Sequence, residues 1–95
     1  MPENSTDRIK LRVVTPTGAA LDAECDSVRL NAAAGEDGEP GMLGIRRGHL
    51  PALILLERGR LKAFLGGEPV ADIGVGGGFA TVADGSVTVL TSEIF

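Results

Sequence analysis

Aromatic residues are nearly absent from this sequence of 95 residues, which contains three phenylalanines but neither tryptophan nor tyrosine. Apolar residues make up 43% of the chain, so aliphatic side chains and alanine must build the core. A chain of this length forms one domain and buries about 60 to 70% of the surface that its unfolded form exposes. We expect a single domain over residues 8–95, preceded by a disordered polar tail over residues 1–7.

The chain also lacks the features of several functional classes. Its net charge is −4, so no basic surface is left to bind the phosphates of a nucleic acid. The longest apolar stretch, residues 50–56, includes a proline and is far shorter than the roughly 20 residues of a membrane helix. No secretion signal is visible, and the single cysteine cannot form an internal disulfide. We therefore expect a cytoplasmic location, no membrane insertion and no nucleic-acid partner.

Groups that could perform chemistry are equally scarce. His49 is the only histidine and Cys25 the only cysteine, so a nucleophilic pair or a zinc site would need ligands that the sequence does not place nearby. Residues 22–26 resemble the start of a calcium loop, but Ser27 stands where that loop requires glycine. The glycines of residues 74–78 follow no βαβ pattern and open no helix, so they indicate a close approach of two strands instead of a phosphate-binding loop. We expect no catalytic residue and no metal, cofactor or small-molecule site.

Glycine, by contrast, is abundant. Fourteen glycines are about twice the usual share of roughly 7%, and they separate short apolar runs, which favours strands joined by tight turns. Residues 8–13 alternate between cations and aliphatic side chains, and turn chemistry at residues 15–18 joins them to a second alternating run at residues 21–26. Antiparallel pairing about this turn matches opposite charges on one face and apolar side chains on the other. The expected pairs are Arg12 with Asp22, Lys10 with Glu24, Arg8 with Asp26, Val13 with Leu21, and Leu11 with Ala23.

The second half of the chain predicts further short strands. Residues 50–56 are interpreted as a buried strand, and residues 61–65 and 69–75 follow after glycine-containing turns. Asp84 and Gly85 form a strong two-residue hairpin signal, which pairs Val82 with Val87 and Ala80 with Val89. No stretch of ten residues shows a helical stripe free of glycine or proline. The predicted fold is therefore all-β, a flattened barrel or β-sandwich of about eight to ten short strands.

Three motifs occur in an order that resembles a known family. Residues 11–16 read LRVVTP, residues 41–51 read GMLGIRRGHLP, and residues 77–82 read GGFATV before VTVL at residues 87–90. The middle segment has three glycines in eight positions, which require special backbone angles and indicate a strand rim that presents a surface. The ordered set covers nearly the whole chain and resembles the ε subunit of F-type ATP synthases.

This resemblance implies a ten-stranded β-sandwich that performs no chemistry itself. It implies a rotor subunit at the foot of the central stalk, which couples the γ subunit to the c-ring during proton- or sodium-driven ATP synthesis or hydrolysis. The subunit would lie peripherally on the cytoplasmic face of the cell membrane. Carried over by position, the residues toward γ are Thr15, His49, Pro51 and Ile54. The residues toward the c-ring are Glu39, Met42 and Leu43.

The sequence departs from the family pattern at three places. Met42 stands where an acidic or small polar residue is usual, and Arg46 and Arg47 stand where an aromatic or aliphatic residue and a proline are common. The loop over residues 32–40 is longer than typical. The usual C-terminal helical hairpin, which binds ATP in some members, is missing. Two alternatives to the rotor subunit remain: a β-sandwich interaction module of another assembly, and a small hydrolase-like β-domain that uses His49.

Overall fold

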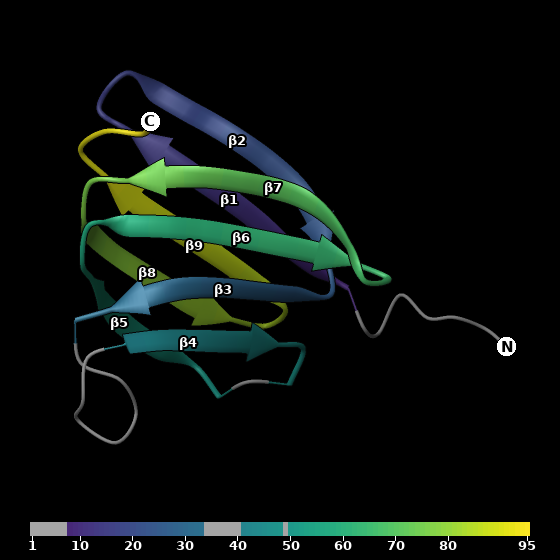
Figure 1. Ribbon diagram of the computed structural model, residues 1–95. Coiled ribbons are helices and arrows are strands. Elements are labelled where there is room, and N and C mark those ends of the chain that lie inside the picture. The colour runs from purple at the N-terminus through teal and green to yellow at the C-terminus, as the bar shows by residue number, and fades with distance from the viewer. Residues whose placement is uncertain (1–7, 34–40, 49) are drawn as a thin grey trace, which may run out of the picture.

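The computed structural model describes residues 8–33, 41–48 and 50–95, and in these ranges it contains nine β-strands and no helix (Figure 1). The strands are β1 (Ile9–Thr15), β2 (Gly18–Cys25), β3 (Ser27–Ala32), β4 (Gly41–Arg46), β5 (Ala52–Leu56), β6 (Gly59–Leu65), β7 (Glu68–Val75), β8 (Gly78–Ala83) and β9 (Ser86–Thr91). The predicted all-β fold is confirmed. No helix that could cross a membrane occurs among the described residues. The predicted tail over residues 1–7 lies outside them.

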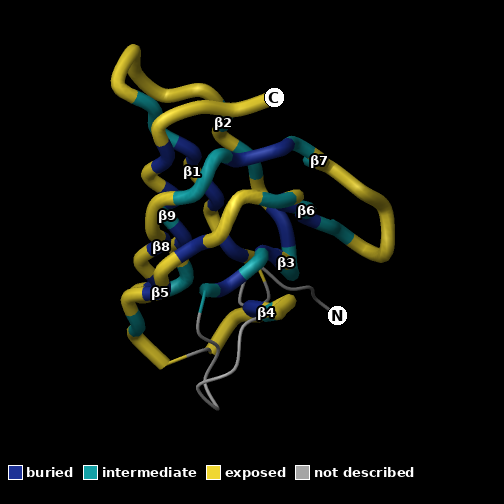
Figure 2. The backbone as a smooth tube through the Cα atoms, turned by 60° about the vertical axis from the view of Figure 1, so that its left-hand side comes forward, coloured by how far each residue is buried: buried dark blue, intermediate teal, exposed yellow. Residues whose placement is uncertain are grey.

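The strands form one sheet that curls into two layers. Its order is β2-β1-β9-β8-β5-β3-β6-β7, and β4 pairs with the free side of β3. In Figure 2 the layer of β1, β9, β8 and β5 faces the layer of β7, β6, β3 and β4. One residue pair, Ala32 with Leu56, joins the layers between β3 and β5, and an isolated bridge from Val75 to Ile94 joins them at the other seam. All pairings between named strands are antiparallel except that of β1 with β9.

The core lies between the layers and consists of aliphatic side chains, alanine and Cys25, as expected from the scarcity of aromatic residues. Alternate residues of each strand point inward, so β1 has the burial pattern buried–exposed–buried–exposed–buried from Ile9 to Val13. Such a period of two is what a sheet with one covered face produces. Some of the largest fully buried side chains are those of Ile9, Leu11, Leu30, Ile45 and Leu61.

The hairpin of β1 and β2 has the predicted register from Lys10 opposite Glu24 to Val13 opposite Leu21. The predicted pairing of Arg8 with Asp26 is wrong, because the ladder ends one residue earlier. Arg8 instead donates a hydrogen bond to the carboxylate of Glu24 at 3.0 Å. The chain turns at Asp26 towards β6, and the Asp26 carboxylate accepts a hydrogen bond from the backbone N–H of Gly66 at 2.8 Å.

The hairpin of β8 and β9 also has the predicted register. Val82 lies opposite Val87 and Ala80 opposite Val89, and all four side chains are buried. Both turn residues, Asp84 and Gly85, have positive φ angles, 48° and 75°. This is the backbone of a type I′ turn, whose twist matches that of the flanking strands.

The interpretation of residues 50–56 as a buried strand is wrong for four of its seven residues, and the strand itself begins at Ala52. Ile54 and Leu56 on β5 point into the core, whereas Leu53 and Leu55 are mostly exposed. A continuous apolar run is buried on both sides only where both faces of the sheet are covered. In this two-layer fold one face of β5 is open, so the run supplies an exposed apolar surface as well as core.

Candidate interaction surfaces

An exposed row of apolar side chains crosses the outer face of one layer. Leu55 on β5 lies opposite Phe79 on β8, which lies opposite Leu90 on β9, which lies opposite Val14 on β1. Leu53 flanks the row, and the side chains of Leu53 and Leu55 are 67% and 60% exposed. Paired residues on one face of a sheet have Cβ atoms about 5 Å apart, so the row is continuous. We call these five residues the apolar strip.

One end of the apolar strip opens into a shallow groove of about 340 Å³. Its lining residues are Val14, Thr15, Pro16, Leu90, Thr91 and Ser92. The hydroxyl of Thr15 is engaged in its own turn, where it donates to the carbonyl of Gly18 at 3.2 Å and accepts from the backbone N–H of Thr17 at 3.3 Å. The hydroxyl of Thr15 is therefore already hydrogen-bonded within its own turn, and its methyl group is the part that is available to a partner in this groove.

The residues predicted to face γ are not gathered at one point. Thr15 ends β1, whereas Pro51 is exposed just before β5, so the two lie at opposite ends of the same layer with the apolar strip between them. Ile54 is 7% exposed and belongs to the core, so β5 faces outward through Leu53 and Leu55. His49 lies outside the described residues.

The residues predicted to face the c-ring lie on or near β4. Met42 is 58% exposed and sits opposite Asn31 of β3, on the outer face of the second layer. Leu43 points the other way, is half-buried and packs against the core. Glu39 lies outside the described residues. Among the described strands β4 pairs with β3 alone, so this second surface, which we call the β4 rim, forms a margin of the sandwich.

The two surfaces point in different directions. The apolar strip covers the outer face of the layer of β1, β9, β8 and β5, and Met42 stands on the outer face of the layer that contains β4 and β3. The outer faces of a two-layer sandwich point away from each other. The domain can therefore contact two partners at the same time.

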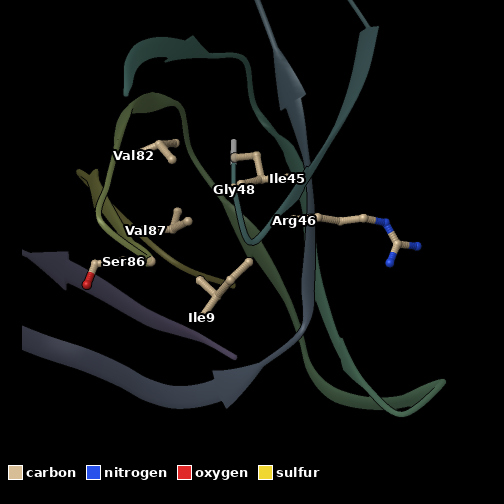
Figure 3. A pocket seen from close by; sticks show the side chains of 8 residues that line it. Ile9, Ile45, Arg46, Gly48, Val82, Ser86 and Val87 are labelled. Carbon is tan, nitrogen blue, oxygen red and sulfur yellow. The ribbon is translucent and has the colours of Figure 1, made fainter. Parts of the chain in front are cut away.

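The turn after β4 packs against the start of β1. Arg47 donates a hydrogen bond from Nη1 to the carbonyl of Arg8 at 3.0 Å, and its guanidinium lies against Gly85. Figure 3 shows Ile9, Ile45, Val82 and Val87 around a cavity beside this turn, with the side chain of Arg46 pointing away from it. The cavity measures about 10 Å³, which is about the space of one water molecule. It is too small for a cofactor or substrate.

The C-terminal residues bridge the second seam of the sandwich at the end of β7. The backbone of Phe95 exchanges two hydrogen bonds with that of Gly74, at 2.7 and 2.9 Å, and Arg58 lies over the Phe95 ring at 4.1 Å. A Cβ atom on Gly74 would lie 2.3 Å from that ring, and one on Gly76 would lie 2.6 Å from the side chain of Glu93. The close approach predicted for these glycines is thus confirmed. We call residues 93–95 with Gly74 and Arg58 the C-terminal clasp.

The titratable groups of the described residues do not form a reactive centre. Cys25 is buried with its Sγ 3.7 Å from the carbonyl oxygen of Ile9. Burial, with the nearby carboxylates of Asp26 and Glu24, raises the pKa of its thiol to about 11. The thiol is therefore protonated and unreactive at neutral pH. No group of three histidine, cysteine or carboxylate side chains in the described part of the chain could hold a metal ion.

Sequence reasoning missed the apolar strip. Its signal was present in the continuous apolar run of residues 50–56, because an antiparallel fold of two layers leaves one face of each strand outside. Phe79 and Leu90 could have been found from the predicted β8–β9 register, which places them on the face opposite the buried valines.

Comparison with known proteins adds the family context. Residues 8–95 match the family described as the ATP synthase delta/epsilon chain β-sandwich domain. The ATP synthase epsilon chain of Granulibacter bethesdensis is 32% identical over 83 residues, which cover 87% of this chain and 57% of that protein. The epsilon chain of a Synechococcus species is 37% identical over 85 residues, with 90% and 57% covered. The epsilon chain of Bacillus subtilis is 33% identical over 82 residues, with 86% and 57% covered. The present chain thus spans 57% of the length of these curated proteins.

Solved structures share the fold. A chain in the Euglena gracilis mitochondrial ATP synthase structure of OSCP, F1 and c-ring superposes with a TM-score of 0.80 at 23% identity, over 100% of this chain and 57% of that one. A chain in the central stalk and c-ring structure of the Tetrahymena thermophila enzyme gives 0.69 at 18% identity, over 92% and 65%. At these identities the likeness concerns the β-sandwich architecture itself.

Proposed function

Because this chain belongs to the family of the ATP synthase delta/epsilon chain β-sandwich domain, we propose that it is a non-catalytic rotor subunit of an F-type ATP synthase. In this role it links the γ subunit to the c-ring and lies peripherally at the cytoplasmic face of the membrane. The observation that carries the proposal is the pair of outward-facing surfaces, the apolar strip and the β4 rim, on opposite faces of one sandwich. A coupling subunit needs two such surfaces and no reactive pocket.

The apolar strip is the surface that we assign to γ. An interface is anchored by apolar side chains that become fully desolvated, and Leu53, Leu55 and Phe79 are large side chains available for this. Thr15 and Pro51 lie at the two ends of the same layer, which agrees with their proposed place at this interface. The core residue Ile54 would support the contact indirectly, because its burial holds β5 in position.

The β4 rim is the surface that we assign to the c-ring. Met42 supplies an exposed, flexible apolar side chain that adapts to irregular partner surfaces. Leu43 fixes the strand to the core and thereby holds Met42 in place. We further propose that Glu39 contacts the c-ring and that His49 contacts γ.

A stiff domain suits the transmission of torque between two partners. Every described strand is paired along its length with at least one neighbour, and backbone hydrogen bonds at the ends of β3 and β7 bridge the two seams between the layers. Deformation of such a sandwich would break several hydrogen bonds at once. Torque is therefore passed on with little loss to bending.

Stepwise assembly tests this proposal. The purified chain is mixed with the γ subunit of the same organism, the complex is isolated by size-exclusion chromatography, and the detergent-solubilised c-ring is added. We expect the chain to co-elute first with γ and then with γ and the ring together. Elution of the chain apart from γ would contradict the proposed function.

A pair of substitutions then separates the two surfaces. Met42→Asp places a charge on the β4 rim and should weaken capture of the ring by about tenfold or more, while binding to γ is kept. Val70→Asp is the matched control, because Val70 is an exposed apolar residue on β7, outside both surfaces. Equal behaviour of the two variants would show that the ring docks elsewhere.

A further inference from the structure

The described glycines fall into groups with different physical roles. Eight have positive φ angles, which residues with a side chain rarely adopt: Gly18, Gly41, Gly48, Gly66, Gly67, Gly77, Gly78 and Gly85. Three more, Gly59, Gly74 and Gly76, would press a Cβ atom within 3 Å of a neighbouring side chain. The remaining one among the described glycines is Gly44, which has neither constraint.

Gly44 lies in the interior of β4, paired with Arg29 of β3. A Cβ atom built on Gly44 meets no atom within 4 Å. Glycine weakens the interior of a strand, because it gains more freedom in the unfolded chain and has no side chain to pack. The fold would therefore be at least as stable with almost any other residue here, and the domain itself does not account for the glycine.

The neighbours of Gly44 show what the open space faces. Met42 and Arg46 stand on the same outer face, two residues to either side along β4. Arg29, the partner of Gly44 on β3, holds its guanidinium over the ring of Phe64 at 5.2 Å. This guanidinium therefore leans towards β6 and away from β4, and leaves the backbone at Gly44 uncovered. The result is a stretch of bare backbone at the margin of the sandwich, with the apolar side chain of Met42 at one end and the guanidinium of Arg46 at the other.

We infer that Gly44 is a contact residue, and that the main chain of a turn in the partner subunit lies directly across β4 at this point. An unexplained glycine within a strand is typical of a site where another backbone approaches closely. In this arrangement Met42 packs against the apolar part of the turn, and the guanidinium group of Arg46 donates to its carbonyl oxygens. The turn stays within reach of Arg46 only while position 44 has no side chain.

This inference rests on the proposed function, since Gly44 is continuous with the β4 rim assigned to the c-ring. The partner is accordingly a turn of the ring subunit, recognised through its backbone carbonyl groups. Position 44, which has no side chain, determines how closely the ring approaches. A contact made by Met42 alone would tolerate a side chain at position 44.

The test compares Gly44→Val with Ala20→Val. Ala20 is an exposed residue of β2, so both substitutions add a β-branched side chain to an exposed strand position, but only the first lies on the β4 rim. Each variant is measured for its urea midpoint, its binding to γ, and the binding of its γ complex to the solubilised ring. We expect both variants to keep or raise the urea midpoint and to bind γ normally. Only Gly44→Val should weaken ring binding, by about tenfold or more.

Each other outcome overturns the inference in a recognisable way. A lower urea midpoint for Gly44→Val alone would mean that the glycine serves the fold. Normal ring binding by a stable Gly44→Val variant would mean that no backbone approaches β4, although the rotor assignment would stand. If the unmodified chain binds neither γ nor the ring, the proposed function fails and this inference fails with it.

Discussion

Replacement of Leu53 and Leu55 by serine should separate binding to γ from folding. Full burial of a leucine side chain contributes about 1.5 to 3 kcal/mol. These side chains are 67% and 60% exposed in the isolated domain, so most of this free energy becomes available only when a partner covers them. Each substitution should therefore weaken binding by about 1 to 2 kcal/mol, or roughly 5- to 30-fold in Kd. The free energy of unfolding should fall by only about 1 kcal/mol or less for each, because little of the side chain is buried before binding.

Calorimetric titration of each variant into purified γ measures the Kd, and urea denaturation of the same preparation measures stability. Val70→Ser is the control, since it also removes an exposed apolar side chain but from β7. We expect the control to bind γ like the unmodified chain. If both leucine variants bind γ as tightly as the control does, the apolar strip is not the γ surface.

Three further predictions concern the fold. Far-ultraviolet circular dichroism should show well under about a fifth helix, against the usual 30–35% of globular domains, and a larger helical signal would contradict the all-β assignment. Gly74→Ala should displace the Phe95 ring and its two backbone hydrogen bonds, which lowers the free energy of unfolding by about 2 to 4 kcal/mol. Arg58→Ala leaves these hydrogen bonds in place and removes only the cation–π contact and an exposed ion pair with Glu93, so it should cost about 1 kcal/mol. Burial raises the pKa of Cys25 from an ordinary 9.0 to about 11. Between these two pH values the folded state keeps the thiol proton, whereas the unfolded state loses it. Stability should therefore be full below about pH 9 and fall by roughly 3 kcal/mol towards pH 11, and this part of the pH dependence should be absent from Cys25→Ala.

The two hairpins could be predicted because their information is local. In the β1–β2 hairpin one register satisfies the charges on one face and the aliphatic side chains on the other, so a slip by one residue would expose the core. The Asp84–Gly85 turn fixes the second register through its backbone angles. Both registers are therefore set by residues within the hairpins themselves.

Features that depend on distant segments could not be predicted in the same way. The exposure of Leu53 and Leu55 depends on the absence of a third layer, which the run of residues 50–56 does not encode. The turn of the chain at Asp26 depends on Gly66, which lies 40 residues later. The backbone N–H of Gly66 donates a hydrogen bond to the Asp26 carboxylate. The C-terminal clasp likewise joins Phe95 to Arg58 and Gly74, so the glycine pattern indicated a close approach but not its partner.

The central claim, that the chain turns with the rotor, is tested most directly by fixing it to the ring. A cysteine at position 42 and one in the facing loop of the c-subunit are joined by oxidation in the reconstituted enzyme, and ATP-driven ion pumping is measured before and after. Two parts of one rotor do not move relative to each other, so we predict that the disulfide forms in high yield and that pumping continues unchanged. Arrest of pumping by the cross-link, with recovery on reduction, would contradict the account, because it would place the chain on the stationary part of the enzyme.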